Sequence, residues 1–98
     1  MTIEIMRTAE KTTIELAGRL DTTTAPDLDK TIQQDVADAK DLVLDFKKLE
    51  YISSAGLRVL LGAQKKMQKI GTMKLINVRE TVMEVFEMTG FADILTIE

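Results

Sequence analysis

The sequence predicts an α/β fold in which an N-terminal β-hairpin joins a mostly parallel sheet packed with helices. Two patterns support this prediction. Apolar and polar residues alternate near the start of the chain, as in strands, whereas later segments repeat apolar residues every three to four positions, as in helices. Short apolar runs separate the helical segments, so strands and helices alternate. With 98 residues, of which 45% are hydrophobic, we expect residues 1–98 to form a single domain with one core.

The first two strands are expected to form the hairpin. Ile3 and Ile5 share one face of the first strand. Ile14 and Leu16 restart the alternation in the second strand, which we expect to end at Gly18. A polar loop follows.

A helix is predicted after this loop. Thr24, with Asp27 three residues later, approximates a capping box, and Pro26 lies in the first turn, where a missing N–H costs little. The apolar residues of the helix form one stripe: Leu28, Ile32, Val36 and Ala39. We expect this stripe to pack on the sheet.

The central part of the chain predicts a buried strand followed by a long helix. The run Leu42–Phe46 is expected to be buried on both faces and parallel to the preceding strand. The inward stripe of the helix is Leu57, Leu60, Leu61 and Met67. Its other side carries a basic stripe: Arg58, Lys65 and Lys69, with Gly62 between them. Gly71 is expected to end the helix in the left-handed conformation.

The last third of the chain predicts a strand, a helix and a short final segment. The fourth strand contains four apolar residues: Met73, Leu75, Ile76 and Val78. Asn77 is expected to cap the next helix, with Glu80 reaching back from the third helical position. Gly90 should end that helix, and Phe91 should pack under the sheet. The chain then closes with a short strand or packing segment at Ile94–Ile97.

The composition excludes several classes of function. The 13 Lys and Arg against 16 Asp and Glu give a net charge of −3, which provides no basic footprint for nucleic acid. Cysteine and histidine are absent, which excludes disulfides, thiolate and histidine catalysis and the commonest transition-metal ligands. Charged residues interrupt the first twenty positions, so we expect no signal peptide, and no apolar run approaches the roughly 20 residues of a membrane span. We therefore expect a cytoplasmic, non-enzymatic protein without cofactor or metal, monomeric when free because no apolar stripe is left exposed.

Two consecutive serines, Ser53 and Ser54, precede the long helix. One serine at this position would act as a helix N-cap, because its hydroxyl can accept a hydrogen bond from a free N–H of the first turn. A cap needs one serine, however, and Ala55 and Gly56 follow with almost no side-chain bulk. The second hydroxyl is therefore expected to be open to an approaching partner.

A phosphate on this turn would suit a switch. A phosphoserine carries about −1.5 to −2 charges, and the positive end of a helix dipole stabilises such an anion by roughly 0.3–2 kcal/mol. The domain would stay folded while a partner that offers a carboxylate or an apolar patch would be rejected. Each 1.4 kcal/mol changes affinity about tenfold, so the repulsion from one phosphate suffices to switch partner binding off.

Three motifs of the chain resemble those of STAS domains, and specifically of stand-alone anti-sigma factor antagonists. Tyr51–Leu57 resembles the serine motif of that family, and Leu16–Asp21 resembles its second-strand signature Leu-x-Gly-x-Leu-Asp. Thr89–Phe91 resembles its C-terminal turn, and the predicted order of elements matches throughout. The resemblance covers essentially the whole chain.

The resemblance implies a partner-switching mechanism. The unphosphorylated protein would bind an anti-sigma factor that is also an ATP-using serine kinase, and so free a sigma factor. The kinase would phosphorylate the antagonist, the pair would separate, and a PP2C-like phosphatase would reset the protein. Aligned on Gly56 and Leu57, the phosphoacceptor falls on Ser54, with Ser53 as the alternative. The family often has Asp at position 53 and Ser or Thr where this chain has Ala55.

The expected partner surface surrounds this serine: Asp21, Thr22, Ser53, Ala55, Gly56, Arg58 and Gly62. By resemblance, Asp21 is expected across the loop, near the hydroxyl of Ser54. The basic stripe of the long helix has two interpretations, a part of the partner surface or a merely solvated helix face.

Two other functions remain alternatives. The first is a scaffold: a STAS subunit that regulates a transporter or another protein through the same helix and is never phosphorylated. The second is a receiver-type enzyme with Asp45 as phosphoacceptor, which would need further carboxylates gathered around Mg²⁺.

Overall fold

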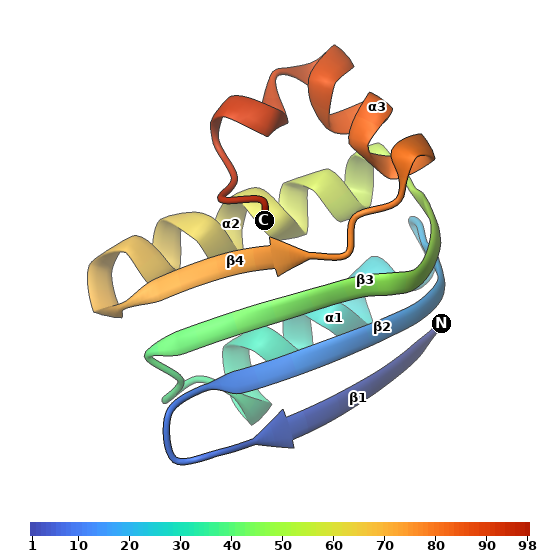
Figure 1. The fold of residues 1–98 in the computed structure, drawn as a ribbon. Coiled ribbons are helices and arrows are strands. Elements are labelled where there is room, and N and C mark those ends of the chain that lie inside the picture. Colours follow the sequence, from blue (N-terminus) through green and yellow to red (C-terminus); the bar gives the residue numbers. More distant parts are fainter.

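Four strands form one mixed sheet in the computed structural model, which describes residues 1–98. β1 (Thr2–Arg7) pairs antiparallel with β2 (Thr12–Leu20), and β2 pairs parallel with β3 (Asp41–Ile52). β4 (Thr72–Ile76) pairs parallel with β3, so the strand order is β1-β2-β3-β4 (Figure 1). The predicted hairpin and mostly parallel sheet are confirmed.

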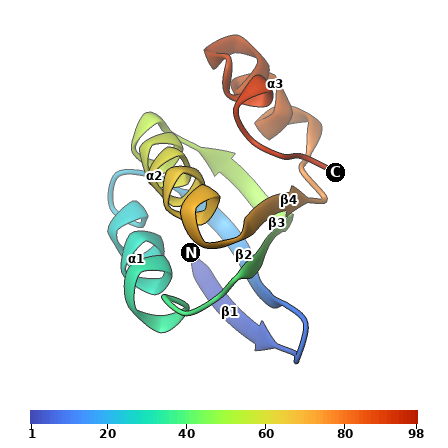
Figure 2. The same cartoon turned by 90° about the vertical axis from the view of Figure 1, so that its left-hand side faces the viewer.

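Two helices cover one face of the sheet, and a third lies toward the β4 side (Figure 2). α1 (Ala25–Lys30), which continues as a π-helical turn at Thr31–Asp35, and α2 (Ser54–Ile70) lie on the covered face. α3 (Glu80–Thr89) lies apart from them and leads into a 3₁₀ turn at Phe91–Asp93. None of these helices has the length and apolar character needed to cross a bilayer.

One continuous apolar core joins the sheet to all three helices. The stripe predicted for the first helix is buried: Leu28, Ile32, Val36 and Ala39. The helix itself is shorter than predicted, because the π-helical turn ends at Asp35 and Val36 and Ala39 follow it. Phe46 on β3 and Phe86 on α3 are fully buried, with ring centroids 6.3 Å apart. This pair ties α3 to the rest of the core.

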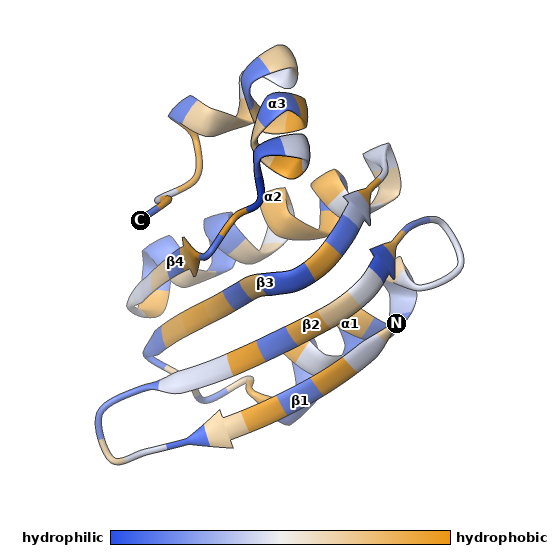
Figure 3. Cartoon of the chain, turned by 45° about the vertical axis from the view of Figure 1, so that its right-hand side comes forward, coloured by the Kyte–Doolittle hydropathy of each residue, from blue (hydrophilic) through white to orange (hydrophobic).

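Hydropathy alternates along β1, β2 and the second half of β3 (Figure 3), which places polar residues of these strands on the sheet face opposite α1 and α2. Glu15 lies between the buried Ile14 and Leu16, and its carboxylate is 3.1 Å from Nζ of Lys48 on β3. The carboxylates of Glu15, Glu4 and Asp45 raise the pKa of Lys48, and the hydrogen bond that Lys48 Nζ donates to Glu15 is the largest cause. Period-two patterning thus separates a core face from a charged face.

The last residues of the chain lie along the outer edge of β4. Leu75 N donates to Thr96 O at 2.8 Å, and Glu98 N donates to Leu75 O at 2.9 Å. The expected final strand is therefore a single parallel bridge between Leu75 and Ile97. Phe91 is partly buried and packs against the core. Because this segment covers β4, β1 is the open edge of the sheet.

Both central strands run further than the sequence predicted. β2 continues past Gly18 to Leu20, and Gly18 adopts a φ of 99° at a point where the pairing with β3 shifts register. β3 extends from Asp41 to Ile52 instead of ending near Phe46. Glycine tolerates this left-handed conformation, which is why the strand can bulge here and continue. The extra length carries the sheet up to the two serines.

Two of the expected helix signals act differently. The hydroxyl of Thr24 makes no capping bond to α1; it donates to Arg19 O at 2.8 Å and accepts from Asp21 N at 2.8 Å. Gly71 ends α2 as predicted, but with an extended φ of 173° and not in the left-handed conformation. A Cβ at Gly71 would lie 1.8 Å from Lys40 O, so close backbone approach requires this glycine. Gly90, by contrast, has the predicted left-handed φ of 81°.

The predicted cap by Asn77 is also wrong. Arg79 is the N-cap residue of α3, with no side-chain capping bond. Asn77 has a φ of 57°, a conformation that asparagine tolerates better than most residues, and its amide Nδ2 donates to Asp45 Oδ1 at 3.0 Å. The side chain therefore links the end of β4 to β3.

Candidate functional site

The carboxyl ends of β2 and β3 bring the predicted site together. Leu20 and Ile52 are paired across the two strands, and Ser53 N donates to Leu20 O at 2.9 Å. Asp21 and Ser53 are therefore the first residues after two adjacent parallel strands. The loop before α1 and the first turn of α2 share one edge of the sheet (Figure 1).

The structure places the two serines in different environments. Ser53 is the N-cap residue, with an extended φ of −103° and ψ of 176°, and its carbonyl accepts from Leu57 N at 3.0 Å. Its hydroxyl is buried and has no hydrogen-bond partner, so the expected serine cap is not formed. Ser54 is the first residue of α2 and is exposed. Of the two predicted acceptors, Ser54 is the accessible one.

The small residues after Ser54 fit the first turn of α2 against the sheet. Gly56 is buried, and a Cβ there would lie 2.7 Å from Cγ of Leu20 and 2.9 Å from Cγ1 of Ile52. Ala55 is half-buried and packs against the core. Packing within the domain therefore requires Gly56, whatever a partner contacts.

An exposed, positively charged stripe runs along α2 from Ser54. Its residues repeat at helical spacing and all are exposed: Ser54, Arg58, Gly62, Lys65 and Lys69. None of the three cationic side chains has an ion-pair partner within the chain. At Gly62 a Cβ would meet no atom within 4 Å, so the stripe is open there. We call these five residues the α2 stripe.

Asp21 organises the loop that faces this turn. Its Oδ1 accepts from Thr23 N at 3.0 Å, from Thr23 Oγ1 at 2.8 Å and from Thr24 N at 3.2 Å. The hydrogen bond from the Thr23 hydroxyl is the main reason that the pKa of Asp21 lies below its ordinary value. Its carboxylate makes no hydrogen bond to Ser53 or Ser54. Thr22, which lies between Asp21 and Thr23 in this loop, is exposed.

Two residues beside the site were not predicted from the sequence. The guanidinium carbon of Arg19 lies 4.0 Å from the ring centroid of Tyr51, and the two residues are paired across β2 and β3. Nε of Arg19 is 3.9 Å from Oδ2 of Asp21. Only the strand register reveals this contact, because no local motif in the sequence links positions 19 and 51.

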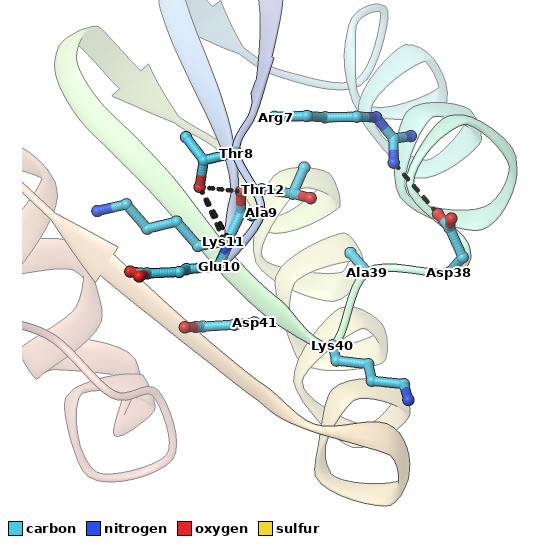
Figure 4. Close-up of a pocket in the computed structure, with 10 residues that line it drawn as sticks. All are labelled: Arg7, Thr8, Ala9, Glu10, Lys11, Thr12, Asp38, Ala39, Lys40 and Asp41. Atoms are coloured by element: carbon cyan, nitrogen blue, oxygen red, sulfur yellow. Dashed lines mark hydrogen bonds and ion pairs between the residues drawn. The ribbon is translucent and has the colours of Figure 1, made fainter.

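A polar cleft of about 290 Å³ lies at the other end of β2 (Figure 4). It is formed by the turn between β1 and β2 and by the segment that leads into β3. Nη1 of Arg7 is 3.3 Å from Oδ1 of Asp38 on one wall, and Lys40 and Asp41 contribute to another. None of the predicted site residues lines this cleft.

The arrangement at the ends of β2 and β3 thus presents an accessible hydroxyl at the positive end of a 17-residue helix. A family model described as the STAS domain matches residues 2–98. The chain belongs to the STAS domain family. The three motifs predicted from the sequence to resemble this family all lie within the matched residues.

This STAS domain is similar to anti-sigma factor antagonists from bacteria. It is 29% identical over 96 residues to the anti-sigma-B factor antagonist of Bacillus subtilis (strain 168), an alignment that covers 97% of this chain and 88% of that protein. An anti-sigma factor antagonist from Mycobacterium paratuberculosis superposes with a TM-score of 0.88 at 24% identity, covering 98% of this chain and 83% of that one.

A third similar structure is the Bacillus cell fate determinant SpoIIAA in its phosphorylated form. The TM-score is 0.76 at 22% identity, and the match covers 99% of this STAS domain and 91% of that chain. At these identities the solved structures support the fold, which agrees with the strand order described above.

Proposed function

We propose that residues 1–98 form a single STAS domain that acts as an anti-sigma factor antagonist, and that phosphorylation of Ser54 switches its binding off. The observation that carries this proposal is the exposure of Ser54 at the start of α2, next to a Ser53 hydroxyl that is buried. The similarity to the Bacillus subtilis antagonist supports the same role. The cytoplasm is the compartment that this role requires.

The proposed partner is an anti-sigma factor with ATP-dependent serine kinase activity. It would dock on the edge that holds Ser54, on the loop of Asp21 and Thr22, and on the α2 stripe. Ala55 is half-buried and Gly56 is buried, so they would contribute by keeping the first turn of α2 close to the sheet. A PP2C-like phosphatase would remove the phosphate and restore binding.

The electrostatics of the first turn of α2 support a switch that leaves the fold intact. A phosphate of about −1.5 to −2 charges on Ser54 would meet the free N–H groups of the helix and the cation of Arg58 one turn later. The net charge would change from −3 to about −5. A partner surface that is neutral or acidic at this point would then be repelled, and like charges in an interface cost several kcal/mol.

The test measures binding to each purified anti-sigma factor with a kinase domain encoded in the source organism, by isothermal titration calorimetry. Wild type and Ser54→Ala should bind one of them with similar affinity, and Ser54→Asp should bind it at least about tenfold more weakly, equivalent to 1.4 kcal/mol. After incubation with that factor and MgATP, mass spectrometry should place one phosphate on Ser54. Ser53→Ala is the matched control, which should still be phosphorylated.

Three outcomes would contradict the proposal. Phosphate on Ser53 alone would assign the wrong acceptor. Equal affinity of wild type and Ser54→Asp, with no phosphate incorporated, would favour the constant scaffold. Binding to none of the anti-sigma factors would remove the antagonist role.

A further inference from the structure

Two neighbours restrain the side chain of Arg19 near the carboxyl end of β2. Its guanidinium carbon lies 4.0 Å from the centroid of the Tyr51 ring, which is a cation–π distance. Its Nε lies 3.9 Å from the Asp21 carboxylate, whose other oxygen is fixed by the threonines of the loop. A ring on one side and a carboxylate at Nε therefore restrict the orientation of the guanidinium.

The terminal nitrogens of Arg19 are free. No hydrogen bond from its Nη1 or Nη2 forms within the chain, and its side chain is 60% exposed. Tyr51 is 40% exposed and is one of the few large, partly apolar side chains at the surface. An arginine offers two parallel N–H groups that match the two oxygens of a carboxylate. Because the fork is already oriented, binding costs less side-chain entropy than it would for a free arginine.

The position of Arg19 relates it directly to the proposed docking edge. Arg19 precedes Leu20, whose carbonyl accepts from Ser53 N, and its own carbonyl accepts from the Thr24 hydroxyl at 2.8 Å. Leu20 points into the core, so Arg19 points to the opposite, polar face of the sheet. The cation of Arg19 and the cation of Arg58 on α2 thus lie on either side of the strand ends that support Ser54.

We propose that the guanidinium of Arg19, held by Tyr51 and Asp21, binds a carboxylate on the anti-sigma factor and so helps to determine which anti-sigma factor this chain accepts. The proposal rests on the proposed function, because it concerns the partner of that same edge. Interface residues that contribute most to binding are enriched in Arg and Tyr, and charged contacts of this kind determine specificity and association rate. A partner with a basic group at this point would be repelled.

The test uses the anti-sigma factor that wild type binds and compares four variants by calorimetry. Arg19→Gln removes the charge and should weaken binding about tenfold, and Arg19→Glu reverses it and should weaken binding about a hundredfold. Tyr51→Leu keeps an apolar side chain without the ring and should weaken binding about threefold. Lys11→Glu is the matched charge reversal in the turn before β2, at the other end of that strand, and should bind as wild type.

Three further measurements separate folding from binding and test the charged contact itself. Circular dichroism must show the same thermal midpoint for Arg19→Gln as for wild type within a few degrees. If Arg19→Glu is unstable, the affinity of the neutral Arg19→Gln variant alone tests whether Arg19 contributes to binding. In the partner, replacing the contacted Asp or Glu by Arg should restore binding to Arg19→Glu. Raising the salt concentration should slow association of wild type more than that of Arg19→Gln.

The outcomes distinguish this proposal from the proposed function. If wild type binds and folded Arg19→Gln binds equally well, or Arg19→Glu weakens binding no more than Lys11→Glu, the role of Arg19 is overturned and the antagonist function stands. If wild type binds no anti-sigma factor, both are overturned.

Discussion

At the scale of single residues, the two glycines of α2 show how the same residue type serves opposite purposes. A Cβ at Gly56 would lie within 3 Å of Leu20 and Ile52, whereas one at Gly62 would meet no atom within 4 Å. Gly56 is therefore required by the fit between the helix and the strand ends. Gly62 lies at an exposed position of α2, where glycine lowers helix stability without avoiding any clash. Packing within the domain therefore does not explain the glycine at this position.

This contrast gives a matched pair of substitutions. We expect Gly56→Ala to lower the free energy of unfolding by about 1–3 kcal/mol, because Leu20 and Ile52 must move. Gly62→Ala should raise it by roughly 0.5–1 kcal/mol, because alanine has the higher helix propensity. Urea denaturation at pH 7 measures both. Equal effects of the two substitutions would contradict the packing described at the strand ends.

The buried hydroxyl of Ser53 leads to a second prediction at this scale. A serine N-cap usually stabilises a helix, so its removal usually costs about 0.5–2 kcal/mol. Here the hydroxyl makes no hydrogen bond, and a buried unsatisfied group costs about 1–3 kcal/mol. Ser53→Ala should therefore raise the free energy of unfolding by about 1 kcal/mol, while Ser54→Ala should change it little. A loss of stability in Ser53→Ala, seen in the same denaturation experiment, would show that Ser53 caps α2 after all.

At the scale of elements, the loop between β2 and α1 depends on one charged group. Asp21 accepts hydrogen bonds from Thr23 and Thr24, and these lower its pKa from the ordinary value of 3.8. A carboxyl group whose pKa is lower in the folded than in the unfolded state stabilises the folded state at pH values above the unfolded-state pKa. This contribution is lost as the pH falls below 3.8 and through the folded pKa.

The loop can be tested through its pH dependence. Between pH 7 and pH 3, the urea midpoint of wild type should fall more than that of Asp21→Asn, because the asparagine keeps an acceptor oxygen but does not titrate. Asp29→Asn on the exposed surface of α1 controls for a general change of charge. Parallel loss of stability in wild type and Asp21→Asn would remove the role of the charged carboxylate in the loop.

At the scale of the whole molecule, one core connects the sheet to every helix, so we expect unfolding in a single cooperative step. Tyr51 is the only tyrosine and the chain has no tryptophan, so intrinsic fluorescence reports the environment next to Arg19 alone. Fluorescence and far-UV circular dichroism should show coincident transitions. Phe86→Ala in α3 should shift both together, lowering the free energy of unfolding by about 3–5 kcal/mol. A shift of only one signal would mean that α3 unfolds separately.

Burial patterns and contacts between distant parts of the chain explain which features could be predicted from the sequence. Alternation and helical spacing depend on which side chains are buried. These patterns correctly predicted the hairpin, the parallel strands and the buried apolar residues from Leu28 to Ala39, although the helix ends before Val36. Gly71 ends α2 as predicted, but its left-handed conformation and the cap by Asn77 were predicted wrongly. The reasons lie in residues far along the chain, Lys40 for Gly71 and Asp45 for Asn77. Local rules for caps contain no information about such neighbours.

Register explains what could not be predicted at the site. Paired residues on β2 and β3 are 30 positions apart in the sequence at Thr12 and Leu42. They are 32 positions apart at Leu20 and Ile52, because the pairing shifts by one residue at two points. Without these shifts Arg19 would lie opposite Leu49 and not opposite Tyr51. The serine motif predicted the location of Ser54, whereas the contact beside it depends on two irregularities that no short motif specifies.

The length of the α2 stripe has a consequence for how completely a partner is released. Ser54 and Lys69 are separated by about 22 Å along the axis, at 1.5 Å per residue, whereas electrostatic effects between exposed charges decay over about 8 Å at physiological ionic strength. A phosphate at one end thus leaves Lys65 and Lys69 electrostatically unchanged. A partner that spans the helix would keep a weak, salt-sensitive hold on the modified protein, and would remain nearby for rapid recapture once the phosphate is hydrolysed.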